Sequence, residues 1–371
     1  MADVEEQAVK PIDVLLVADD DVFNRLGSVV RHICVGMIDE GVRLTVLLRP
    51  GCKKSGDTIG PSRVVNLPGR YWFQRRYSAQ EVLDFLGFDS PQIVHCMSAD
   101  LARWIRPWTE EWKSGLLVHM TDLFDVDRFR FLSSSNRTMG VAATASIAKA
   151  ALEKYLGLEE RIRNVPLGIP AQQESVCFSH AERMPVVVLS VPLTKYCGLE
   201  GVFKALKSIV QNGKELHLFI LETGPAERTF RRLVDQMDLR AYVTFTGRMR
   251  DWATFSQALQ AADLYLVPST YRRFGIKTLT AMATGMGILA PVGTIQDYLV
   301  DGETASLFDP LKPKKLAAKW EKLLEDRDFT RQLANNALEH VRAHHKASMM
   351  VGGIAKFYRD ICALAGKKDN A

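Results

Sequence analysis

The chain alternates between short apolar runs and longer stretches whose apolar residues recur at helical spacing. Residues 12–18 are almost continuously apolar and end at three aspartates, and residues 23–40 follow with apolar positions three or four apart. A continuous apolar run is typical of a strand buried on both faces, and the spacing after it predicts an amphipathic helix. Repeated strand–helix pairs predict a parallel sheet with helices on its faces.

The same alternation predicts most of the remaining elements. In the first half it predicts strands at 43–48, 92–95 and 116–120 and helices at 78–88 and 145–156. In the second half it predicts strands at 186–191, 216–221, 242–246 and 264–267, and helices at 199–210, 226–237, 253–262 and 276–284. A late helix around 316–324 and a final helix at 347–365 complete the prediction.

One segment, 171–185, interrupts the alternation. It is polar, has no periodicity and is bracketed by prolines, so we interpret it as a linker between domains. The prediction is therefore an N-terminal domain over 1–170, a C-terminal domain over 186–345 and a final segment over 346–371. We expect an α/β fold with two Rossmann-like, doubly wound domains, whose ligands bind beyond the carboxyl ends of the strands.

Composition excludes several classes of protein. The chain has 371 residues, 47% of them hydrophobic, and its six cysteines are scattered, which excludes a disulfide scaffold and disfavours a zinc site. No apolar run approaches the roughly 18 residues of a membrane span, and the first ten residues lack the pattern of a signal peptide. We therefore expect a cytoplasmic protein. Neither a G-x-G-x-x-G nor a P-loop motif is present, which disfavours a dinucleotide-dependent dehydrogenase and a P-loop NTPase.

The most informative run is 267–285. A strand ends at Pro268, a loop carries Arg272 and Arg273, and Gly275 precedes a predicted helix. Two guanidinium groups beside a helix N-terminus predict an anion site, because free amides and the helix dipole both favour negative charge. The alternative is a glycine that serves a tight turn between solvated arginines.

This run, with the Asp-Gly-Glu-Thr sequence at 301–304, resembles the donor-binding region of retaining family-4 glycosyltransferases (glycosyl transferases group 1). The segments 245–249, 261–269 and 224–225 follow in the family's order and spacing, and 92–95 and 163–169 resemble motifs of its first domain. The resemblance implies the GT-B fold, in which two Rossmann-like domains face a central cleft and the C-terminal helix crosses back to the first domain.

The resemblance also implies a function and a set of site residues. It implies transfer of a sugar from a nucleotide-diphosphate donor with retention of anomeric configuration, without a metal or cofactor. The acceptor would be a saccharide or a lipid-linked sugar. The implied catalytic residues are Lys195, Arg272 and His95. The implied donor-binding residues are Arg273, Phe274, Gly275, Ile276, Thr280, Gly224, Arg248 and Met249, and those on the acceptor side are Gly27, His119, Thr121 and Asp122.

The family's signature contains two glutamates separated by seven residues, and here Arg272 and Thr280 stand in their place. A carboxylate accepts hydrogen bonds from sugar hydroxyls, whereas arginine has no acceptor and threonine keeps one hydroxyl. The alternative function is therefore a catalytically inert GT-B protein that binds a ligand or acts as a scaffold.

Two runs, 70–77 and 101–113, interleave basic and aromatic residues. Such runs can seat a protein at an anionic membrane surface, so we keep peripheral contact with the inner face of the membrane as an alternative. The competing interpretation is that Trp104, Trp108 and Trp112 line one helix face packed on the first sheet. We expect no nucleic-acid partner, since no binding module accompanies these runs. Three aspartates at 19–21 are better explained by a solvated loop than by a cation site.

Overall fold

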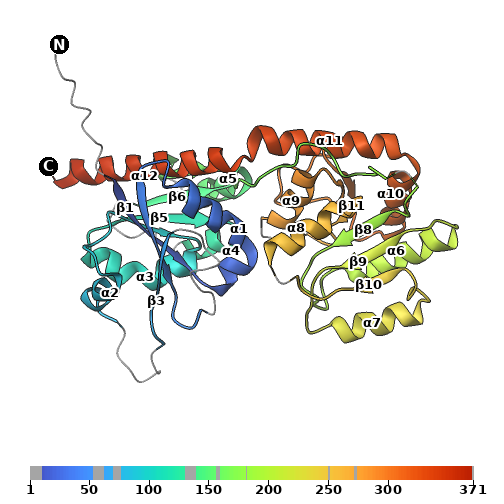
Figure 1. Cartoon of the computed structure of the whole chain (residues 1–371), viewed down its shortest axis with the longest axis horizontal. Coiled ribbons are helices and arrows are strands. Elements are labelled where there is room, and N and C mark those ends of the chain that lie inside the picture. The colour runs from blue at the N-terminus through green and yellow to red at the C-terminus, as the bar shows by residue number, and fades with distance from the viewer. Residues whose placement is uncertain are drawn as a thin grey trace, which may run out of the picture. The chain divides into compact units, whose positions relative to one another are not determined.

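The computed structural model describes residues 11–52, 62–69, 77–129, 139–155, 159–180, 182–249, 251–270 and 274–369. The chain forms two units, each built on one parallel sheet (Figure 1). The first unit combines Met1–Gly168 with Ala347–Ala371, and the second is Ile169–Lys346. The predicted α/β class with two Rossmann-like domains is confirmed.

The first unit contains a seven-stranded sheet in the order β3-β2-β1-β4-β5-β6-β7. Its elements are β1 (Ile12–Ala18), α1 (Asp20–Gly36), β2 (Val42–Leu48), β3 (Arg63–Asn66), α2 (Ala79–Leu86), β4 (Ile93–Cys96), α3 (Ala99–Glu111), β5 (Gly115–Met120), α4 (Leu123–Arg128), β6 (Met139–Ala143), α5 (Ala145–Lys154), β7 (Ile162–Asn164) and α12 (Ala347–Asp369). Residues 14–18 of β1 are all buried, as the continuous apolar run predicts for a strand with both faces covered. The order of strands reverses between β1 and β4, which makes this pair the switch point of the sheet.

Helix α12 packs on the first unit, although it follows the whole second unit in the sequence (Figure 1). It contacts α1 and the strands β4, β5 and β6. Phe357 is buried and lies directly over Gly140 of β6, where an added Cβ would come within 2.5 Å of the phenyl ring. The predicted return of the C-terminal helix to the first domain is therefore confirmed.

The second unit contains a six-stranded sheet in the order β10-β9-β8-β11-β12-β13. Its elements are β8 (Val186–Leu189), α6 (Leu199–Gln211), β9 (His217–Ile220), α7 (Glu227–Gln236), β10 (Val243–Phe245), α8 (Trp252–Gln260), β11 (Leu264–Leu266), α9 (Ile276–Thr284), β12 (Gly287–Pro291), β13 (Ser306–Phe308), α10 (Pro313–Glu325) and α11 (Arg327–His344). Its core contains the fully buried Trp320 of α10 and the apolar faces of α6 and α7. Here the switch point lies between β8 and β11.

The segment 171–185, which the sequence suggests is a linker, packs onto the second unit. Asp263, at the start of β11, is buried and accepts hydrogen bonds from the backbone amides of Phe178 (3.1 Å) and Val186 (2.8 Å). It also pairs with Arg183 at 3.0 Å. The amides of Gln172, Val176 and Cys177 donate to the carbonyls of residues 283–285 at the end of α9, so the segment is held by tertiary contacts rather than by a helix or strand ladder of its own.

The tryptophans of 101–113 line a packed helix face. Trp108 and Trp112 of α3 are buried, and their indole N–H groups donate to the carbonyls of Tyr77 and Ala79. The packing interpretation is therefore correct for these two rings. Trp104 is only partly buried and lies edge-on to Trp108, with ring centroids 5.0 Å apart. Residues 70–76 of the other aromatic run lie outside the described residues.

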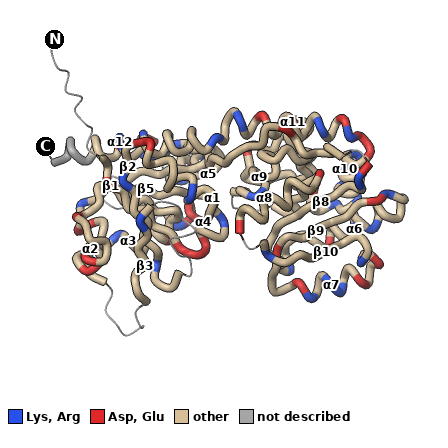
Figure 2. Tube along the Cα trace, viewed as in Figure 1, with Lys and Arg blue, Asp and Glu red and all other residues tan. Residues whose placement is uncertain are grey.

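Charged residues lie mainly on the helices and loops of both units, while the strands are nearly free of them (Figure 2). Lys and Arg alternate with Asp and Glu along α7, α10 and α11. Within the residues that the structure describes, no helix is both long enough and apolar enough to span a bilayer.

Candidate functional site

The helices beside the two switch points begin differently. In the first unit, the side chain of Asp19 accepts from the amide of Val22 at the start of α1, and Ser98 caps α3 in the same way. In the second unit, α6 begins after Gly198 and α9 after Gly275, and neither has a side-chain cap among the described residues. The amide of Leu199 contacts the Cys197 thiol and that of Ile276 donates to the Phe274 carbonyl. Within the described residues, the other first-turn amides of α6 and α9 remain available to an anion at the switch point of the second sheet.

A cluster of four polar side chains lies at this switch point, and we call it the Lys277 cluster: Ser190, Glu222, Arg248 and Lys277. Lys277 comes from the first turn of α9, Ser190 follows β8 and Glu222 follows β9. The Lys277 ammonium donates to Ser190 Oγ at 2.7 Å and to Glu222 Oε2 at 2.8 Å. Arg248 Nε donates to Glu222 Oε1 at 2.6 Å. Lys277, on the helix that follows β11, thus contacts residues that follow the neighbouring strands β8 and β9.

Glu222 is buried, and its carboxylate is held between two cations. Burial would raise the pKa of Glu222, but Lys277 and Arg248 outweigh burial and bring the pKa below its ordinary value. The carboxylate is therefore ionised at neutral pH. Two cations and one anion leave the cluster with a net charge of +1.

The predicted donor residues around the start of α9 are partly brought together. Gly275 is packed so closely against Gln296 that an added Cβ would come within 2.5 Å of its amide nitrogen. Phe274 is buried against Tyr298, with ring centroids 5.3 Å apart. The amide of Ile276, which we expected to bind a phosphate, donates instead to the Phe274 carbonyl at 3.2 Å.

The other predicted donor residues differ in exposure. Thr280 is buried, and its hydroxyl donates to the carbonyl of Ile276 at 2.8 Å, as a threonine within a helix often does. Gly224 lets the turn after β9 contact the backbone of Leu193. Met249 is partly buried and Lys195 is exposed in the loop before α6. Arg272 and Arg273 lie outside the described residues.

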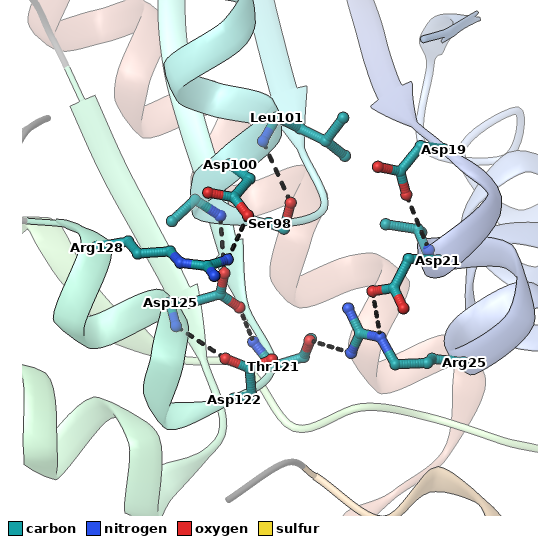
Figure 3. A network of polar contacts seen from close by, with 12 residues as sticks. Asp19, Asp21, Arg25, Ser98, Asp100, Leu101, Thr121, Asp122, Asp125 and Arg128 are labelled. Carbon is teal, nitrogen blue, oxygen red and sulfur yellow. Dashed lines mark hydrogen bonds and ion pairs between the residues drawn. The ribbon is translucent and has the colours of Figure 1, made fainter. Parts of the chain in front are cut away.

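The corresponding edge of the first unit carries a polar network (Figure 3). Thr121 accepts from Arg25 of α1 at 3.2 Å, and its amide donates to Asp125 at 3.2 Å. Asp122, the N-cap of α4, accepts from the amide of Asp125 at 2.8 Å. Thr121 and Asp122 lie directly after the carboxyl end of β5, and Arg25, which was not among the predicted site residues, contacts Thr121 there.

Asp125 is the most perturbed carboxyl group of this network. Burial, together with the neighbouring Asp122 charge, raises the pKa of Asp125 to about 6. Its oxygens accept from the amides of Ala99 and Thr121, so the carboxyl group joins the starts of α3 and α4. Asp125 is thus a buried residue that holds the starts of α3 and α4 together at the carboxyl edge of the sheet.

The two predicted histidines lie in the core of the first unit. His95 and His119 are completely buried with nearly parallel rings 5.6 Å apart, and Tyr358 of α12 hydrogen-bonds His95 Nδ1 at 2.7 Å. Burial lowers the pKa of His119 to about 4 and that of His95 well below its ordinary value. Neither ring is accessible to a substrate, because α12 covers the strand ends that carry them.

Gly27, the remaining acceptor-side residue, lies within α1 next to a kink at Leu26 and has open space around its Cα. The aspartates at 19–21 act in protein contacts, since Asp19 caps α1 and Asp21 pairs with Arg25 at 2.8 Å. In the described part of the chain, no group of three or more His, Cys, Asp or Glu side chains is arranged to hold a metal ion.

The predicted site residues did not include Glu222, Lys277, Ser190 and Arg25. Glu222 is an acidic residue directly after an apolar strand, and Lys277 is a charged residue in an otherwise apolar helix start. These two signals were visible in the sequence. What links them is the adjacency of β8, β9 and β11, which only the folded sheet provides.

Comparison with known proteins identifies the second unit. Residues 174–340 match the family described as glycosyl transferases group 1. The chain is 26% identical over 178 residues to an alpha-D-kanosaminyltransferase of Streptomyces kanamyceticus, covering 48% of this chain and 46% of that protein. It is 39% identical over 188 residues to a D-inositol 3-phosphate glycosyltransferase of Corynebacterium diphtheriae, covering 48% and 44%. These alignments thus span less than half the length of either relative.

The fold of the whole chain also matches solved structures. The Anabaena protein HepE, solved in complex with UDP-glucose, superimposes with a TM-score of 0.75 at 15% identity, covering 94% of this chain and 99% of that one. At this identity the match establishes the fold, which is the two-domain GT-B architecture that the sequence motifs imply. The second unit therefore matches the family of glycosyl transferases group 1, and the chain as a whole has the GT-B fold.

Proposed function

We propose that this protein is a glycosyltransferase that takes a sugar from a nucleotide-diphosphate donor bound at the carboxyl edge of the second sheet. The observation that carries the proposal is the pair of uncapped helix starts, α6 and α9, on either side of the β8/β11 switch point. The homologous domain belongs to a glycosyltransferase family, and HepE, which has the same fold, binds UDP-glucose. A diphosphate fits this edge because free amides and helix dipoles favour phosphate oxygens.

In the proposed reaction, the site must stabilise the nucleoside diphosphate as it leaves the sugar. As the bond between the sugar and the diphosphate breaks, negative charge grows on the phosphate oxygens. Preorganised N–H donors of α6 and α9 stabilise that charge, and holding donor and acceptor together removes much of the entropic barrier. We propose retention of configuration and a saccharide or lipid-linked acceptor, as the family resemblance implies.

The missing signature glutamates favour one competing function, an inert binding or scaffold protein. Thr280 occupies one glutamate position, and its buried hydroxyl donates to the helix backbone instead of projecting into solvent. On the proposed function, phosphate contacts therefore contribute more of the donor affinity than sugar contacts do.

Calorimetric titration of the full chain with UDP-, GDP- and ADP-glucose tests the proposal. We expect micromolar affinity for at least one of the three, and weaker binding of the matching nucleoside, because the diphosphate supplies the charge that the helix starts attract.

Millimolar or absent binding across all three sugars would contradict transfer and favour the inert protein. Binding without turnover of the donor, measured by release of the nucleoside diphosphate with simple saccharides and a polyprenyl-linked sugar, would also support the inert alternative. The anomeric coupling constant of the product is a separate measurement, and it shows whether the configuration of the sugar is retained.

A further inference from the structure

The Lys277 cluster has spare hydrogen-bond donors, while described residues already occupy three of the roughly four acceptor positions on its carboxylate. Glu222 Oε1 accepts from Arg248 Nε and, at 3.3 Å, from the amide of Thr223, and Oε2 accepts from Lys277. The Lys277 ammonium has three hydrogens, of which Glu222 and Ser190 take two. Among the residues that the structure describes, no partner takes the third hydrogen of Lys277 or the terminal nitrogens of Arg248, which leaves them for a ligand. That ligand must be an acceptor of hydrogen bonds and, given the net charge of +1, an anion.

The cluster holds its lysine in one place. Ser190 Oγ donates to the carbonyl of Leu221 at 3.3 Å, so its lone pairs face Lys277. The ammonium also lies 5.5 Å from the centre of the Phe255 ring. An exposed lysine loses about 2 kcal/mol of side-chain entropy when it is immobilised, and these contacts impose much of that loss before any ligand arrives. Lys195, by comparison, is exposed in its loop.

We propose that Lys277 is the cation that binds the donor's diphosphate in this chain, and that Glu222 is the positioning residue that fixes Lys277 at the switch point. This inference rests on the proposed function and adds the residues that perform it. Lys277 lies one residue beyond the first residue of α9, so its ammonium and the uncapped amides of that helix lie at the same edge. Glu222 is buried and already accepts hydrogen bonds from Lys277, Arg248 and Thr223, which separates its role from that of the glutamates missing from the signature.

The effect of Glu222→Gln on the affinity for a nucleoside diphosphate distinguishes a positioning role of Glu222 from a purely electrostatic one. Glu222→Gln raises the net charge of the cluster by one, so pure electrostatics predicts tighter binding of UDP, GDP or ADP. If Glu222 positions Lys277, the same substitution weakens binding of the nucleoside diphosphate by about 3- to 10-fold despite the added positive charge. Lys277→Met is expected to weaken it by about 10- to 100-fold, while the affinity for the parent nucleoside changes less than about twofold.

The controls use the same full-length protein. Lys204→Met removes a lysine from the exposed face of α6 and is expected to leave the affinity for the diphosphate unchanged. Lys277→Arg retains the positive charge and is expected to restore most of the affinity that Lys277→Met loses. A measurement on the unsubstituted protein guards against misfolded variants: UDP, GDP or ADP at saturation should protect Lys277, and not Lys204, from acetylation by an amine-reactive reagent, as read by mass spectrometry.

The outcomes distinguish this inference from the proposed function. Binding of a diphosphate by the unsubstituted protein, with no effect of Lys277→Met and no protection of Lys277, overturns the inference and leaves the function standing. Tighter binding by Glu222→Gln overturns the positioning role. Failure of the unsubstituted protein to bind any of the three diphosphates overturns both.

Discussion

Replacing Phe357 with alanine is expected to lower the free energy of unfolding of the first unit by about 3–5 kcal/mol. Phe357 is buried on the face of α12 that packs on the sheet, its ring faces the Cα of Gly140, and the guanidinium of Arg163 stacks over it at 4.9 Å. Gly140 has no side chain to fill the space that alanine would leave, so the cavity persists. Urea unfolding followed by the fluorescence of the α3 tryptophans measures the change.

Met349→Ala is the matched control for Phe357→Ala. Met349 lies on the same helix but is 52% exposed, so its truncation should change the free energy of unfolding by less than about 0.5 kcal/mol. A loss below about 1 kcal/mol for Phe357→Ala would show that α12 does not seal the sheet in the way described.

His119 is expected to make the free energy of unfolding depend strongly on pH. Its pKa is about 4 in the folded protein, against 6.5 for a free histidine, so the unfolded chain binds the extra proton between these values. Stability is therefore lost as pH falls from about 6.5 to 4, by about 3 kcal/mol for this residue. His119→Phe keeps a ring against His95 without nitrogens and should remove this dependence.

Asp125 acts in the opposite direction and must be separated from His119. Its pKa is raised from 3.8 to about 6, so the folded protein binds the extra proton between these values, and stability is gained as pH falls through that range. The measurement is the difference in unfolding free energy between the natural protein and His119→Phe at pH 7 and at pH 4. We expect the variant to gain about 3 kcal/mol relative to the natural protein over this interval. A constant difference would contradict a buried, neutral His119.

The fold was predictable wherever an apolar run had clear boundaries. The predicted strand 12–18 and helix 276–284 agree with Ile12–Ala18 and Ile276–Thr284. In the first case Asp19 ends the apolar run and caps the next helix, and in the second Gly275 and Gly285 mark both ends. The strands β3 and β7 went unpredicted because each has only three or four residues and one buried position, too few to establish a period.

The site was less predictable than the fold because its contacts join distant parts of the chain. Lys277 meets Glu222 across 55 residues and Ser190 across 87. Nothing in the local pattern around these residues specifies that β8, β9 and β11 are neighbours. The histidines show the converse difficulty. His95 and His119 were placed correctly on strands near the carboxyl edge, but only the position of Tyr358, 263 residues after His95, buries them.

Binding of a diphosphate at the carboxyl edge of the second sheet is tested most directly by a crystal structure with bound nucleoside diphosphate. We expect phosphate oxygens within hydrogen-bond distance of the Lys277 ammonium and of a first-turn amide of α9. Phosphates bound at a different edge, or a diphosphate whose oxygens contact neither Lys277 nor the start of α9, would contradict it.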